Sequence, residues 1–138
     1  MPKNVRIYFP GVSKPKISRA VNSILPKNKA IGDFGLIFVS SKRIAELNKK
    51  YRGKSGPTNV LSFAAYGEPR SGWDSGDVVI CPSVVKKQAE KLGFTQKKWM
   101  TQLIVHGILH LAGYEHKSII GRKAMEKMED KVLKKLGV

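Results

Sequence analysis

Apolar side chains recur along this chain with two periods, and the period changes from one segment to the next. A spacing of three and four residues places side chains on one face of a helix and predicts five helices. They cover residues 15–25, 41–50 and 82–92, a long segment between Thr95 and Gly113, and residues 118–136. Alternation and short apolar runs predict four strands, at residues 5–9, 34–39, 59–64 and 77–81.

The long segment after Thr95 differs from the other predicted helices because its apolar residues lie on more than one face. They are Trp99, Leu103, Ile104, Ile108 and Leu109. Such a helix is expected to be buried, so we place it at the centre of the fold. The strands and helices do not alternate strictly, which favours an α+β class. We expect a single domain over residues 1–138, with about five helices and a sheet of about four strands.

The charge balance is the second strong signal. Lysine and arginine total 26 residues against 10 aspartate and glutamate residues, which gives a net charge of +16. This excess favours a polyanionic partner, because each phosphate that the protein neutralises releases a counterion. A generally solvated basic surface is the other interpretation.

The cysteine count and the lengths of the apolar runs indicate the cellular compartment of the protein. The single cysteine, Cys81, excludes an internal disulfide and is typical of a reducing environment. The first residues hold no apolar stretch of about 7–15 residues, as a signal peptide would. No apolar run approaches the roughly 20 residues that span a bilayer. We expect a cytoplasmic protein without membrane association.

All three histidines fall within eleven residues, at His106, His110 and His116. The first two are four apart, so on a helix they share one face. Gly113 can end the helix in a left-handed conformation, after which the chain can turn back and bring His116 to the same point. Three imidazoles around an open fourth position are the layout of a catalytic zinc site. We expect one Zn²⁺ per chain, although three imidazoles also suit other divalent metals.

The spacing of this motif matches the zinc proteases with one difference. Gly107 follows the first histidine, where H-E-x-x-H-x-x-G-x-x-H has glutamate. That glutamate is the general base of the proteases, so its absence weighs against peptide hydrolysis. A metal held there still lowers the pKa of its water to about 7.

Three blocks carry a family resemblance: Leu47–Phe63, Gly76–Cys81 and His106–His116. They resemble the YbeY family of metal-dependent endoribonucleases, in which a glycine after the first histidine is distinctive. The resemblance implies a mixed sheet with the histidine helix packed beneath it. It also implies single-strand-specific RNA cleavage in rRNA maturation, at the 3′ end of 16S rRNA, and in ribosome quality control. Glu115 stands where the family commonly has aspartate.

The block after the second predicted helix supplies further candidates. Arg52 can bind a phosphate in a bidentate manner, and the family arginine at this position is implicated in activity. Thr58, Asn59 and Ser62 open and line the next strand. They either hydrogen-bond the substrate or orient a ligand imidazole, or they only form the turn and start the strand. Asp77 either bonds a histidine nitrogen or shapes its turn.

These residues define a mechanistic hypothesis. His106, His110 and His116 hold zinc, and Arg52 and the zinc-bound water act on the scissile phosphodiester, with Arg52 and His106 as the catalytic residues. Direct attack on phosphorus and attack by the ribose 2′-OH both remain open.

The partners follow from charge and resemblance. We expect RNA, in the form of rRNA and ribosomal particles, with a ribosomal protein or GTPase as a further candidate and no specificity for DNA. Two other functions remain open. One is a ribosome-associated RNA-binding factor with a mainly structural zinc, and the other is a zinc hydrolase of a non-RNA substrate.

Overall fold

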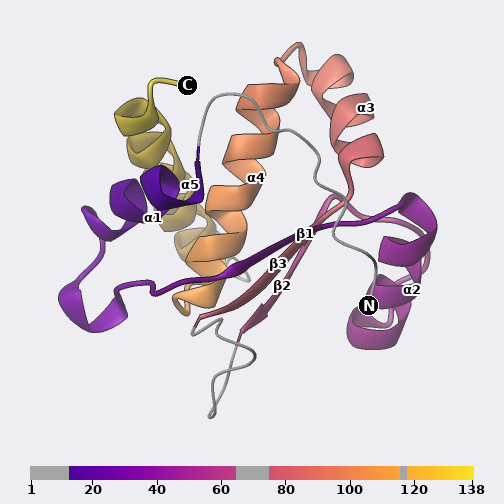
Figure 1. Cartoon of the computed structure of the whole chain (residues 1–138), viewed down its shortest axis with the longest axis horizontal. Coiled ribbons are helices and arrows are strands. Elements are labelled where there is room, and N and C mark those ends of the chain that lie inside the picture. Colours follow the sequence, from indigo (N-terminus) through magenta and orange to yellow (C-terminus); the bar gives the residue numbers. More distant parts are fainter. Residues whose placement is uncertain (1–12, 65–74, 116–117) are drawn as a thin grey trace.

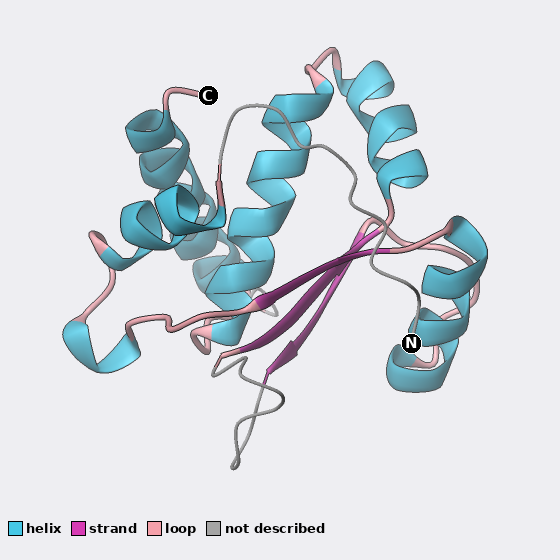
Figure 2. Cartoon of the chain, viewed as in Figure 1, coloured by secondary structure: helices cyan, strands magenta, loops and turns pink. Residues whose placement is uncertain are grey.

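The computed structural model describes residues 13–64, 75–115 and 118–138 (Figures 1 and 2). Its helices are α1 (Lys14–Asn22), α2 (Ser41–Arg52), α3 (Pro82–Leu92), α4 (Gln96–Leu111) and α5 (Ile119–Leu136), with a short 3-10 helix, η1 (Lys27–Lys29). Its strands are β1 (Gly35–Phe38), β2 (Val60–Ala64) and β3 (Gly76–Ile80). The five predicted helices and three of the predicted strands are confirmed. The strand predicted at residues 5–9 lies outside the described residues.

The three strands form one mixed sheet in the order β1-β3-β2. The middle strand, β3, pairs with β1 in parallel, so that Leu36 lies opposite Val78. It pairs with β2 in antiparallel, so that Ser62 also lies opposite Val78. The mixed sheet and the α+β class are therefore confirmed, with three strands in the described residues where about four were expected.

Successive residues of a strand point to opposite faces of a sheet, and here the two faces meet different helices. Val78 and Ile80 join the larger apolar core, to which α4 contributes most. Val79 joins a smaller apolar cluster around Ile44 of α2. Figure 1 shows α4 running along the sheet, with α1 and α5 beyond it, while α2 lies apart from them. The sheet thus separates α2 from the histidine helix.

Helix α4 is the central helix, as its apolar pattern predicts. Eight of its sixteen residues are buried. The side chain of Thr95 caps its start by accepting a hydrogen bond from the Lys98 amide at 3.1 Å. Gly113 follows its end with a φ of +98°, a conformation that costs other residues more. The predicted cap and the predicted left-handed glycine are both present.

No helix of residues 13–64, 75–115 and 118–138 is long and apolar enough to cross a membrane.

Candidate active site

Two histidine side chains of α4, those of His106 and His110, converge near the C-terminal end of the helix. Their Nε2 atoms lie 3.0 Å apart. The two rings meet edge to face, with centroids 4.6 Å apart and an interplanar angle of 84°. His106 and His110 are both half-buried, so the pair sits at the surface of the core rather than within it. The predicted convergence of these two residues is confirmed.

The opposite nitrogen of each ring faces an acceptor. Nδ1 of His110 lies 2.8 Å from the carbonyl oxygen of Tyr114, in the turn after α4. Nδ1 of His106 lies 3.3 Å from Oε1 of Glu129, on α5. A carbonyl and a carboxylate only accept, which favours the tautomers with the proton on Nδ1. In those tautomers Nε2 of each neutral ring carries a lone pair, and the two Nε2 atoms are placed to bind one cation between them.

This geometry fits a metal centre. Two nitrogen ligands about 2.0–2.1 Å from a tetrahedral zinc lie about 3.3 Å from each other, close to the observed 3.0 Å. Proteins usually orient a ligand imidazole by placing a hydrogen-bond acceptor next to the ring nitrogen that does not bind the metal. The third predicted ligand, His116, lies outside the described residues. Within the described part of the chain, His, Cys, Asp and Glu form no group of three that could hold a metal ion.

Gly107 shows why the protease glutamate is absent. This residue faces the sheet, and a Cβ atom added to it would lie 2.8 Å from Cγ1 of Val78 and 3.0 Å from Oγ of Ser62. Contacts shorter than 3.0 Å require the neighbours to move. The position therefore has no room for a side chain, and a glutamate there could not be accommodated without displacing α4 from the sheet. The missing base is a consequence of how the helix packs.

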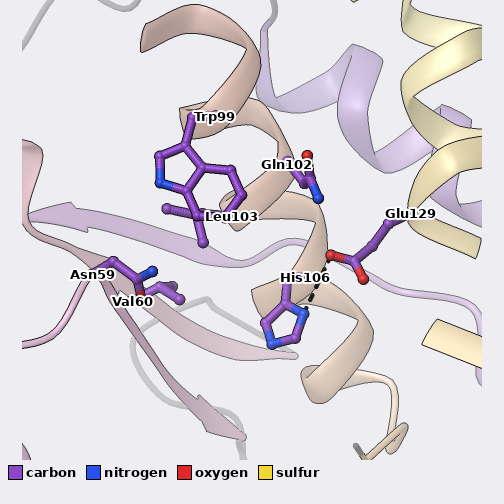
Figure 3. A pocket seen from close by; sticks show the side chains of 7 residues that line it. All are labelled: Asn59, Val60, Trp99, Gln102, Leu103, His106 and Glu129. Atoms are coloured by element: carbon purple, nitrogen blue, oxygen red, sulfur yellow. Dashed lines mark ion pairs between the residues drawn. The ribbon is translucent and has the colours of Figure 1, made fainter. Parts of the chain in front are cut away.

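A cavity of about 230 Å³ adjoins His106 (Figure 3). Its floor is one partly buried face of α4, and its walls are the start of β2 on one side and α5 on the other. Besides His106 it is lined by Asn59, Val60, Trp99, Gln102, Leu103 and Glu129. The dashed line in Figure 3 marks the ion pair between His106 and Glu129. One of the predicted substrate residues, Asn59, thus shares a cavity with a predicted metal ligand.

The other predicted substrate residues lie in different surroundings. Ser62 donates a hydrogen bond to the Gly107 carbonyl oxygen at 3.1 Å and so ties β2 to α4. Thr58 is half-buried in the segment before β2. Arg52 is the exposed last residue of α2. It forms no hydrogen bond or ion pair with His106 or His110 among the described residues, and its role stays a prediction.

Glu129 is the functional residue that the sequence analysis missed. It is buried, with 6% of its surface exposed, in the apolar stripe of α5 that also holds Met125 and Val132. An acidic residue at a core-facing position of an amphipathic helix is the signal that could have revealed it, because a buried carboxylate requires a partner. Asp77, the acid considered for this role, lies on the strand position next to Val78 and so faces the α2 side of the sheet.

A family model described as Endoribonuclease YbeY matches residues 11–137 of the chain. The chain belongs to the YbeY family. Among curated relatives named Endoribonuclease YbeY, that of Pelotomaculum thermopropionicum is 38% identical over 130 residues, covering 88% of this chain and 85% of the relative. That of Bartonella henselae is 35% identical over 128 residues, covering 89% of this chain and 80% of the relative.

A solved structure shares the fold. The solution structure of TM1509 from Thermotoga maritima is 29% identical in sequence, with a TM-score of 0.56, and the alignment covers 90% of this chain and 87% of that one. For this YbeY-family chain, family membership supports an endoribonuclease role in rRNA processing, and with it an RNA substrate. The histidine pair, the cavity and Glu129 all lie within the matched residues.

Proposed function

We propose that this protein is a zinc-dependent endoribonuclease that cleaves single-stranded RNA and acts on rRNA, at the 3′ end of 16S rRNA. The observation that carries the proposal is the pair of Nε2 atoms 3.0 Å apart, with both Nδ1 atoms directed at acceptors. The net charge of +16 supports a phosphate-rich substrate. Family membership supports RNA as that substrate.

The proposed ligands are His106, His110 and His116. A zinc ion held by them supplies Lewis acidity and lowers the pKa of a bound water to about 7. Glu129 and the Tyr114 carbonyl keep the protons on the Nδ1 atoms, so that both Nε2 lone pairs point to one place.

Arg52 is the proposed phosphate-binding residue. Its guanidinium stays charged at any working pH and can form two parallel hydrogen bonds with a phosphodiester. The exposed end of α2 leaves this side chain accessible to RNA. Among the described strands β2 lies at one edge of the sheet, and we propose that an RNA strand that crosses this edge contacts both Arg52 and the cavity beside His106.

Cleavage of a labelled single-stranded RNA by the zinc-loaded protein tests the proposal. Chelation and His106→Ala should abolish cleavage. Arg52→Ala should reduce it by about 10²–10³-fold, the usual effect of removing one group that stabilises transition-state charge. Arg43→Ala, near the other end of α2, removes an equal charge from a half-buried arginine that pairs with Glu46 and should change the rate little.

The outcome separates the alternatives. Circular dichroism and metal analysis of each variant show whether lost cleavage reflects lost folding. A folded, zinc-loaded wild-type protein that binds RNA without cleaving free RNA or ribosomal particles would contradict the endoribonuclease proposal and favour a ribosome-associated binding factor. A 2′,3′-cyclic phosphate on the product would identify attack by the ribose 2′-OH.

A further inference from the structure

One face of α4 continues from His106 toward the start of the helix, and its side chains are half-buried except for that of Leu103, which is buried. Trp99, Gln102, Leu103 and His106 follow each other at intervals of three, one and three residues, so they share one face. The cavity of about 230 Å³ lies over this face. Ligand sites for drug-sized molecules measure roughly 300–1,000 Å³, so this cavity suits a smaller group such as a single planar ring.

Gln102 supplies polar atoms that the fold leaves unused. Its side chain is half-buried and lines the cavity. It forms no side-chain hydrogen bond with any other described residue, while its carboxamide offers both donors and an acceptor. In Figure 3 the side chain stands on α4 near the rim of the cavity that Glu129 also forms. A donor and an acceptor on one planar group match the edge of a nucleobase.

The opposite wall of the cavity is held rigidly by one residue of α3. Oε1 of Gln88 accepts a hydrogen bond from Nδ2 of Asn59 at 2.9 Å and another from Nε1 of Trp99 at 3.0 Å. These two hydrogen bonds hold the Trp99 indole ring and the Asn59 carboxamide in place. The Oδ1 atom of Asn59 is an acceptor on the same wall. A fixed indole beside apolar Leu103 and Val60 is a surface against which a base can pack.

We infer that this cavity is a nucleobase subsite, in which one base of a single-stranded RNA packs against Trp99 and Leu103 while Gln102 hydrogen-bonds its edge. The subsite adjoins His106, so it fixes which base lies next to the cleaved phosphodiester. The inference rests on the proposed function, because it assumes an RNA substrate. It adds a specificity-determining residue, Gln102, that lies outside the metal ligands.

Binding of four fluorescent 2′-O-methyl hexanucleotides, each containing a single base type, tests the inference by anisotropy on the zinc-loaded protein. The wild-type protein should discriminate about tenfold between the best and the worst base, the scale of one base-edge contact. Gln102→Leu keeps the volume but removes the polar atoms, and should erase this discrimination. An abasic hexamer should bind both proteins alike. Gln96→Leu, an exposed glutamine of the same helix, is the matched control.

The two ways of failing are distinct. Equal affinity of the wild-type protein for all four bases, or unchanged discrimination in folded Gln102→Leu, would overturn the subsite while leaving RNA cleavage intact. Failure of the wild-type protein to bind any hexamer at low salt would overturn the proposed function together with the subsite.

Discussion

Glu129→Gln is the substitution that most directly tests the architecture of the histidine pair. Glutamine keeps the shape of the side chain and can still accept a hydrogen bond from His106, but it removes the negative charge. A hydrogen bond to a charged group contributes about 1.5–3 kcal/mol, and a neutral one about 0.5–1.5 kcal/mol. The two differ by about 1–1.5 kcal/mol, and because the 3.3 Å separation from Nδ1 is long for such a bond, we expect no larger effect.

That difference corresponds to about a tenfold loss of zinc affinity, within the 10–100-fold range seen for partners of ligand imidazoles. Competition with a chromophoric chelator measures the affinity directly and does not depend on RNA cleavage. Glu126→Gln is the matched control, because Glu126 is an exposed acid on the same helix. Circular dichroism of the metal-free proteins checks that both variants fold.

Equal zinc affinity of folded Glu129→Gln and Glu126→Gln would refute the reasoning. It would mean that the carboxylate only fills space in the core and does not orient His106 as a ligand. A loss of affinity in both variants would also refute it, because the effect would then come from net charge rather than from contact.

Three further substitutions probe the packing that surrounds the site. Gly107→Ala should lower the free energy of unfolding, because overpacking costs about 1–3 kcal/mol. The higher helix propensity of alanine offsets roughly 1 kcal/mol of that cost. Thermal denaturation should show partial rescue when Val78→Ala is added, and no rescue would contradict the close contact. Gly121→Ala should weaken zinc affinity in the chelator assay, because its Cβ would lie 2.6 Å from the Glu115 carbonyl oxygen and displace the turn after α4; unchanged affinity would show that the turn yields elsewhere. Gln88→Leu leaves two half-buried donors unsatisfied and should lower the free energy of unfolding, measured by urea denaturation, by about 2 kcal/mol. An unchanged free energy of unfolding would show that water replaces Gln88.

The sequence predicts best what depends on neighbours in the chain. The caps of α4, its left-handed glycine and the shared face of its two histidines all follow from spacings of three to four residues, and the structure has each of them. The predicted helix ends and strand positions are also close to the observed ones, because glycine, proline and serine act locally on the backbone.

What the sequence could not supply are contacts between distant segments. Glu129 lies 23 positions after His106, its partner, and the sequence pattern around it indicates only an amphipathic helix. The sequence shows that glycine stands where the proteases have glutamate, but the reason is the contact between Gly107 and Val78 of β3. The cavity combines β2, α4 and α5, so no single segment could indicate it. Arg52 and Thr58 stay predictions, since no hydrogen bond or ion pair joins them to His106 or His110 within the described residues.

The position of Glu129 on α5 also has a consequence for how the protein is made. A ribosome synthesises the chain from its N-terminus at about 5–20 residues per second, so His106 and His110 leave the exit tunnel before Glu129 does. During that interval the histidine helix lacks the carboxylate that orients it. On the proposed function, a nascent chain surrounded by ribosomal RNA would hold an unfinished site, and would become able to cleave RNA only once α5 has docked.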